Sequence, residues 1–194
     1  MQKEWNSIQT LLARVNPALL EGIRPGATNE ELDAFAADIQ LKLPVFFREF
    51  YSIHDGQSHP AQEGLIFGFE LLSLKRIQET MKEFRAQVDL NAEADIQMDV
   101  FPEYFIKPLV VHTQWLIFAR LGRDYLAVDL DPHPAYGNPG QVIYISHQSL
   151  ILKWLALNFR GFINNFIWEL GLGNFEFNEQ GGFTYKKKFS ATSF

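Results

Sequence analysis

The apolar residues of this chain change their spacing partway along the sequence. In several segments before residue 89 they recur every three or four positions, which is the period of an amphipathic helix. Between residues 115 and 145 they form short continuous runs, which are typical of buried strands. Helical spacing then returns. This order favours a single α+β domain with a central antiparallel sheet and helices packed against it.

The predicted helices of the first half have recognisable ends. Thr28 and Glu31 have the spacing of a capping box, which predicts a helix after Thr28. Pro44 is suited to the first residue of the next helix, and Gly56 to the position just past its last turn. Ser73 is a plausible cap for a further helix. The positions predicted to be buried on these helices and on one at the N-terminus are Trp5, Ile8, Leu11, Leu12, Val15, Leu32, Phe35, Ala36, Ile39, Phe47, Phe50, Tyr51, Ile77, Met81, Phe84 and Val88.

Four apolar runs are short enough for strands. Residues 65–69 are one such run. Residues 116–120 and 125–130 flank a Gly-Arg-Asp turn and predict an antiparallel hairpin, and residues 141–145 predict a third strand after a proline-rich turn. The sheet is therefore expected to contain an antiparallel meander.

A long final helix is predicted from Ser146 or Ser149 to about residue 170, with Trp154 and Leu155 on its buried face. The residues after it, 171–194, are expected to form a C-terminal extension that contains a hairpin around two glycines and a lysine-rich tail.

Composition excludes several classes of function. With 47% apolar residues, including 18 Phe, the chain can fill a large core and is not a disordered protein. The absence of Cys excludes disulfide scaffolds, thiolate nucleophiles and cysteine-ligated metals. A net charge of −6 argues against nucleic-acid binding. No signal peptide and no apolar stretch of 18 residues is found, so we predict a cytoplasmic protein without membrane insertion.

No residue pattern indicates catalysis, a cofactor or a metal. His54 and His59 are five positions apart, which is not the spacing of helical metal ligands. Asp129, Asp131 and His133 could offer ligands, but the prolines around them are better explained by a tight turn. Nucleotide-binding and nucleophile-elbow motifs are missing. We therefore predict no catalytic residue, no cofactor and no metal.

Acidic residues and exposed aromatic residues are the candidates for binding a partner. Residues 89–100 are expected to form an exposed acidic loop, and a second acidic turn is expected around residues 129–131. Tyr104, His133 and Tyr136 lie near predicted turns, where aromatic rings can anchor a partner. The acidic residues would attract a basic protein. The predicted partner-binding residues are Asp89, Glu93, Asp95, Asp99, Asp129, Asp131 and Tyr136.

Three segments occur in an order that resembles a known family. They are residues 43–56, which begin with Leu-Pro and end with His-Asp-Gly; Trp115; and residues 128–142, which combine Val-Asp-Leu-Asp-Pro, a glycine and Gly-Gln-Val. Together they resemble the SUKH superfamily, also described as the cell-wall assembly regulator family. The resemblance is strongest over residues 28–170, and the chain departs from the family pattern at Ile117, where a proline is usual.

The resemblance implies an α+β fold without catalytic residues that acts by binding other proteins, and it implies that Trp115 packs in the core. Many bacterial members are immunity proteins, so the leading hypothesis is a protein that neutralises a toxin domain, which could be basic. The alternative is a regulatory scaffold in cell-wall synthesis. A hypothesis from another class, a small-ligand binder or an enzyme that uses residues 129–141, stays open.

Overall fold

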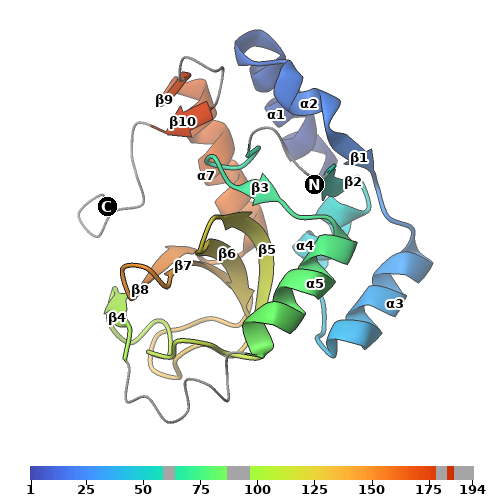
Figure 1. Ribbon diagram of the computed structural model, residues 1–194. Coiled ribbons are helices and arrows are strands. Elements are labelled where there is room, and N and C mark those ends of the chain that lie inside the picture. Colours follow the sequence, from blue (N-terminus) through green and yellow to red (C-terminus); the bar gives the residue numbers. More distant parts are fainter. Residues whose placement is uncertain (59–63, 87–96, 178–182, 186–194) are drawn as a thin grey trace.

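The computed structural model describes residues 1–58, 64–86, 97–177 and 183–185. Within these residues the chain forms one α+β domain with six helices and a six-stranded mixed sheet (Figure 1). The helices are α1 (Gln2–Val15), α2 (Ala18–Glu21), α3 (Asn29–Ile39), α4 (Val45–Tyr51), α5 (Leu74–Arg85) and α7 (Phe159–Gly171).

The sheet has the strand order β3-β5-β6-β7-β8-β4. All neighbouring strands are antiparallel except β8 and β4, which run parallel at one edge. The predicted central antiparallel sheet is thus confirmed, with one parallel edge strand added to it. The strands are β3 (Glu70–Leu71), β5 (Trp115–Leu121), β6 (Asp124–Asp129), β7 (Gln141–Ser146), β8 (Ile151–Ala156) and β4 (Asp99–Phe101).

Two small antiparallel pairs accompany the main sheet. Strand β1 (Ile23–Pro25) pairs with β2 (His54–Gln57), although neither segment has the apolar run that predicts a strand. Strand β9 (Phe175–Phe177) pairs with β10 (Phe183–Tyr185) and confirms the predicted terminal hairpin. The lysine-rich tail after it lies outside the described residues.

The helices pack in layers around the sheet. Helix α7 contacts β7 and β8 and is covered on its other side by α1 and α4, whereas α5 packs along β5 and α3 lies outside α5 (Figure 1). The predicted apolar stripes face these contacts: Trp5, Phe47 and Ile77 are almost completely buried. Burial of such large side chains supplies most of the driving force for folding.

The sequence signals for helix starts are confirmed by hydrogen bonds. At the start of α3, the Glu31 N–H donates to Thr28 Oγ1 at 3.2 Å and the Thr28 N–H donates to Glu31 Oε2 at 2.8 Å. The Arg76 N–H donates to Ser73 Oγ at 3.4 Å and caps α5. Pro44, expected as the first residue of α4, instead precedes the helix by one position as its N-cap residue, without a side-chain capping bond.

The prediction of one helix from residue 146 to residue 170 is wrong in its first half. Residues 151–156 form strand β8, which pairs with β7, and α7 starts only after Asn158, whose side chain accepts from the Gly161 N–H at 2.9 Å. A short apolar run suits a buried strand as well as a helix, and only pairing with a neighbouring strand decides between them. Trp154 therefore lies half-buried on a strand rather than in the helix core.

Two further predictions are corrected by close backbone packing. Gly56 has the predicted left-handed conformation, with φ +64°, but lies in β2, because α4 already ends at Tyr51. A Cβ on Gly56 would lie 2.5 Å from the carbonyl of Leu72, so this close approach requires glycine. Residues 65–69 form a tight turn with a single bridge between Ile66 and Phe69, not a strand.

Candidate protein-binding surface

The last residue of β6, Asp129, and the first residue of β7, Gln141, form a buried polar pair. One Asp129 carboxylate oxygen accepts from Gln141 Nε2 at 3.0 Å and the other from the Asp131 N–H at 3.2 Å. Burial raises the pKa of Asp129 above the usual range of a carboxyl group, and the hydrogen bond from Gln141 opposes this shift. Asp129 is fully enclosed. Contrary to the prediction from the sequence, it therefore has no surface to offer a partner, because the strand end faces the interior here.

Gln141 connects this pair to a second segment of the chain. Its Nε2 atom also donates to the Phe105 carbonyl at 2.8 Å, and its Oε1 atom accepts from the Asn138 N–H at 3.1 Å. The Gly140 N–H donates to the Asp129 carbonyl at 2.7 Å. Residues 129–141 thus form a turn in which these buried polar groups are satisfied, as buried polar groups must be for stability.

Asp131 points outward but is already paired within the chain. Its Oδ2 atom lies 2.5 Å from Lys107 Nζ and 3.0 Å from His112 Nε2. The hydrogen bond from Lys107 is the main reason that the pKa of Asp131 lies below its ordinary value. Asp131 is consequently ionised at neutral pH, but its charge is shared with Lys107 before any partner arrives.

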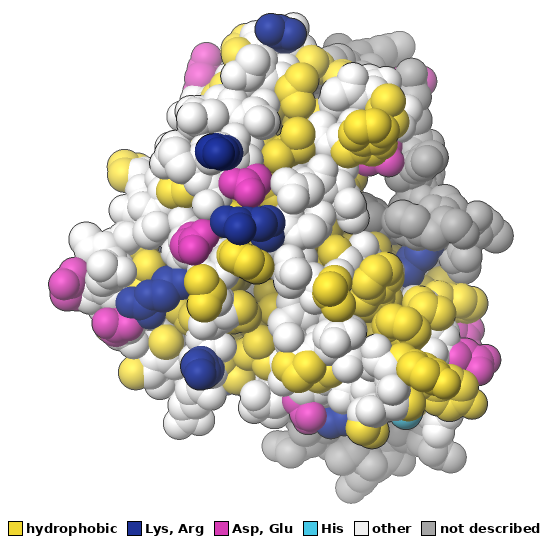
Figure 2. All heavy atoms as spheres, turned by 180° about the vertical axis from the view of Figure 1, so that it is seen from behind, with side chains coloured by type: hydrophobic (Ala, Val, Ile, Leu, Met, Phe, Trp, Pro, Cys, Tyr) yellow, Lys and Arg dark blue, Asp and Glu magenta, His cyan; other side chains and the backbone are white. Residues whose placement is uncertain are grey.

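Five aromatic rings meet beside this turn, and we call Tyr104, Phe105, His133, Tyr136 and Trp154 the aromatic face. The ring centroids are 5.6 Å apart for Tyr104 and His133, 6.0 Å for Phe105 and Tyr136, and 5.8 Å for Phe105 and Trp154. Tyr136 and Tyr104 keep 63% and 55% of their surface exposed. Hydrophobic side chains gather at the lower right of the face seen in Figure 2, with acidic side chains beside them.

The aromatic face is held by direct backbone pairing between its two exposed segments. The Tyr136 N–H donates to the Tyr104 carbonyl at 3.2 Å, and the His133 N–H donates to the Phe105 carbonyl at 3.3 Å. At Gly137 a Cβ would lie 2.4 Å from the Phe105 carbonyl oxygen, so only glycine permits this approach. Tyr104 has φ +66°, a conformation that a bulky side chain rarely adopts. The backbone that carries the exposed rings is therefore held in place.

The structure brings together some of the candidate partner-binding residues and separates others. Tyr136 is exposed, and its N–H pairs with the carbonyl of Tyr104, whose ring contacts that of His133; these are the other two aromatic candidates. The sequence reasoning misses Phe105 and Trp154, although Phe105 directly follows Tyr104. Trp154 is not among the candidates because the apolar spacing predicts a helix, with residue 154 on its buried face.

The predicted acidic loop is only partly described. Asp89, Glu93 and Asp95 lie outside the described residues. Asp99 is exposed, but it lies on the edge strand β4 and not in a loop, and the preceding Met98 is buried against the core. Residues 99 and 100 therefore do not belong to an exposed loop as predicted, because their backbone pairs with β8.

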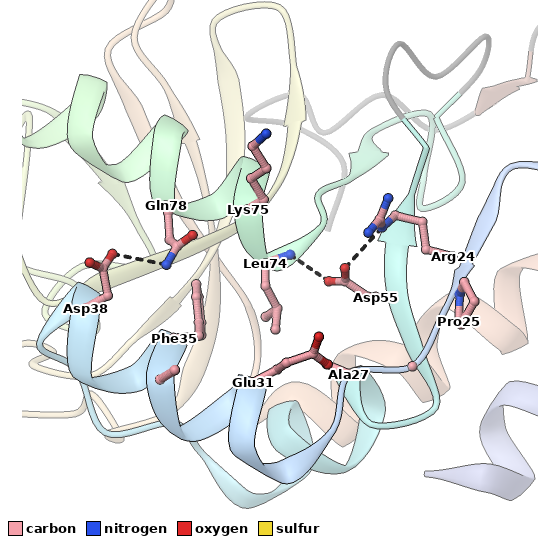
Figure 3. A pocket seen from close by; sticks show the side chains of 12 residues that line it. Arg24, Pro25, Ala27, Glu31, Phe35, Asp38, Asp55, Leu74, Lys75 and Gln78 are labelled. Carbon is pink, nitrogen blue, oxygen red and sulfur yellow. Dashed lines mark hydrogen bonds and ion pairs between the residues drawn. The ribbon is translucent and has the colours of Figure 1, made fainter.

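A groove of about 660 Å³ lies at the other end of the domain, between helices α3 and α5 and strands β1 and β2 (Figure 3). The buried side chains of Phe35 and Leu74 line it. Asp55 accepts from the Leu74 N–H at 2.7 Å and from Arg24 Nε at 3.1 Å, as the dashed lines show.

The remaining polar groups of this groove also serve the fold. Glu31 caps α3, and Asp38 accepts from Gln78 Nε2 at 3.1 Å, which joins α3 to α5. These carboxylates complement helix termini or tie helices together. The groove is thus better explained as a structural junction than as a reaction site.

The next feature is the set of possible metal ligands in the described part of the chain. No group of three His, Asp or Glu side chains in it could hold a metal ion. Asp131, His112 and Lys107 do form a polar cluster, but the lysine occupies the place where a cation would bind. Separately, no helix among the described residues is long and apolar enough to cross a membrane.

The chain is similar in sequence to fungal regulators. It is 27% identical over 224 residues to KNR4/SMI1 homolog 2 of Debaryomyces hansenii, an alignment that covers 92% of this chain and 37% of the relative. It is 32% identical over 131 residues to the cell wall biosynthesis/cell cycle regulator smi1 of Schizosaccharomyces pombe, covering 61% of this chain and 26% of the relative.

A shorter match is with human F-box only protein 3, at 37% identity over 57 residues, which covers 29% of this chain and 12% of that protein. The chain therefore spans well under half the length of these three curated relatives. The SMI1/KNR4 family (SUKH-1) matches residues 26–165, a segment that contains α3 to α5, the whole six-stranded sheet and the aromatic face. By this match over most of its length, the chain belongs to the SMI1/KNR4 family.

Proposed function

We propose that this chain is a non-catalytic, cytoplasmic protein-binding module of a regulator of cell-wall synthesis and the cell cycle. Its aromatic face contacts the partner. The observation that carries this proposal is the exposure of Tyr104 and Tyr136 on two segments that hydrogen-bond to each other.

Rigid, exposed tyrosines are suited to protein recognition. A tyrosine supplies a large contact area with only two side-chain torsions to immobilise, so little conformational entropy is lost on binding. The backbone bond between Tyr136 and Tyr104 removes a further source of disorder before the partner arrives. The buried polar groups of the neighbouring turn, Asp129 and Gln141, are occupied by the fold, which supports binding over catalysis.

The relatives favour the second of the two protein-binding functions inferred from the sequence. The names of the Debaryomyces and Schizosaccharomyces proteins support a regulatory module over a toxin-neutralising one. The observation that favours immunity is the net charge of −6, which suits a basic toxin domain. Regulation is therefore the leading proposal, and immunity is the second candidate.

The test is a chimera made in Schizosaccharomyces pombe. The segment of smi1 that aligns with this chain is replaced by the chain itself, and growth is measured in the presence of a wall-digesting glucanase, together with the timing of septation. We expect the chimera to restore wild-type growth, and we expect the same chimera with Tyr104→Asn and Tyr136→Ser to fail. Asparagine at position 104 is chosen because it tolerates positive φ.

The matched control is Trp168→Ser, since Trp168 is 67% exposed on α7 and does not belong to the aromatic face. That chimera should grow like the unsubstituted one. Immunoblots show whether each chimera accumulates. A chimera that accumulates normally but restores neither growth nor septation would contradict the regulatory proposal, whereas rescue that survives the double change would contradict the assignment to the aromatic face.

A further inference from the structure

Beyond the existence of a protein partner, the aromatic face carries information on the chemistry of the segment it binds. Its two exposed tyrosines belong to segments about thirty residues apart in sequence, and the backbones of these segments hydrogen-bond to each other at the two tyrosines. Surfaces that present several exposed aromatic rings are used to bind proline-rich peptides, because proline rings pack on aromatic rings and the polyproline II helix is already ordered before binding.

The hydroxyl groups of the two tyrosines fit the same ligand. A polyproline II helix makes no internal hydrogen bonds, so its carbonyl oxygens remain available as acceptors. Neither the Tyr104 nor the Tyr136 hydroxyl makes a hydrogen bond with another side chain or carbonyl in the described residues, and both side chains are largely exposed. Each can therefore donate to a backbone carbonyl of the ligand while its ring contacts a proline.

Charge next to the aromatic face indicates a basic residue in the ligand. Glu103 directly precedes Tyr104. Its side chain is exposed, and in the part of the chain that the structure describes it forms no ion pair. Asp131, by contrast, is already paired with Lys107. Glu103 is consequently the carboxylate beside Tyr104 that can meet an Arg or Lys of the ligand.

From these contacts we infer that the aromatic face binds a proline-rich segment that carries a basic residue. This inference rests on the proposed function, since it names the chemistry of the partner at the same surface. Prolines pack on Tyr104 and Tyr136, the two hydroxyl groups donate to backbone carbonyls, and Glu103 pairs with the basic residue.

The test measures peptide binding to the purified chain by fluorescence anisotropy. Three fluorescein-labelled peptides of equal length are compared: one with the repeat Pro-Pro-Arg-Pro, one with Glu in place of Arg, and one with Ser in place of the prolines but with the arginines kept. We expect the first peptide to bind at least about tenfold more tightly than either of the others, which is the loss expected when a dominant contact is missing.

Substitutions then locate the binding site. Tyr136→Ser, and independently Tyr104→Asn, should weaken binding of the arginine peptide by about tenfold or more, whereas Tyr136→Phe should cost less because it keeps the ring. Glu103→Gln should weaken binding roughly two- to fivefold and reduce its dependence on salt, as expected for an exposed charge pair. Trp168→Ser is again the control and should leave the affinity unchanged. Circular dichroism shows that each variant is folded.

The outcomes separate this inference from the proposed function. If the chimera fails with the tyrosine substitutions while the three peptides bind equally or not at all, the partner is recognised by other chemistry and the inference is overturned, although the proposed function stands. Equal binding of the arginine and serine peptides would likewise overturn it, since charge alone would explain the affinity. Proline-dependent binding that Tyr136→Ser and Tyr104→Asn both leave intact would place the ligand elsewhere and overturn it as well.

Discussion

Two aromatic clusters of this protein have similar ring geometry but opposite exposure. Beneath α7, the ring of Phe118 meets those of Phe159 and Phe162 edge-on, with centroids 5.1 and 5.6 Å apart, and all three are almost completely buried. On the aromatic face, rings at comparable distances leave Tyr104 and Tyr136 mostly exposed. The difference shows that aromatic side chains of similar geometry can stabilise the core in one place and remain available for recognition in another.

The backbone explains why the second cluster persists without burial. The core rings are held by α7 and β5, which bury them between two layers. The rings of the aromatic face are held instead by hydrogen bonds between their own main-chain segments and by Gln141. The comparison therefore predicts that core substitutions change stability, while substitutions on the aromatic face change binding.

The largest effect is expected for Phe118→Ala. Removing a fully buried ring leaves a cavity, and the free energy of unfolding should fall by about 3 to 5 kcal/mol. Urea unfolding followed by circular dichroism measures it, with Trp168→Ala as the exposed control. A loss below about 1 kcal/mol for Phe118→Ala, the range of surface substitutions, would break the distinction between the two clusters.

A smaller loss is expected for Gly137→Ala. The added Cβ would approach the Phe105 carbonyl oxygen to 2.4 Å, and the shift required to relieve this contact should cost about 1 to 3 kcal/mol. It should also weaken binding at the aromatic face, because it moves the two segments apart. Gly171→Ala is the matched control, since nothing lies within 4 Å of the Cβ added there. Equal stability of the two variants would show that the close approach is not needed.

The pH dependence of stability sharpens the contrast between the buried and exposed carboxylates. Burial raises the pKa of Asp129 in the folded state, so its contribution to stability is present below the unfolded pKa of about 3.9 and is lost as pH rises through the folded pKa. The hydrogen bond from Lys107 lowers the pKa of Asp131, so its contribution is present above that unfolded pKa and is lost as pH falls through the folded pKa.

The slope of the unfolding free energy against pH should therefore change in opposite directions in the two asparagine variants. Asp129→Asn removes a contribution that decreases with rising pH, and Asp131→Asn removes one that increases with it. Urea midpoints measured at acidic and neutral pH test this. A slope that changes in the same direction in both variants would contradict the buried environment assigned to Asp129 or the ion pair assigned to Asp131.

The smallest effect on stability is expected for Tyr136→Ser. This side chain is mostly exposed, so the free energy of unfolding should change by about 0.5 kcal/mol or less. The measurement is the urea midpoint, with Tyr136→Phe beside it. A loss comparable to that of Phe118→Ala would mean that the aromatic face is part of the core and would remove the argument for recognition.

Local sequence signals predict much of the fold. The capping box at Thr28, the Ser73 cap and the hairpin of β5 and β6 depend on residues close together in the chain, and the structure confirms them. The burial of Trp115, which the family resemblance implies, is confirmed as well. By contrast, the prediction of a helix over residues 146–156 is wrong, because that run can be classified only once its partner strand is known.

The candidate site shows the same division. Turn chemistry is local, so the residue pattern around Tyr104 and Tyr136 is enough to predict that both side chains are exposed. The burial of Asp129, the pairing of Asp131 with Lys107 and the contact between the two tyrosine segments emerge only when the chain is folded. These outcomes depend on hydrogen bonds and ion pairs between residues that are separated in sequence. Such contacts leave no periodic pattern in either segment, because the packing of the whole sheet selects each residue's partner.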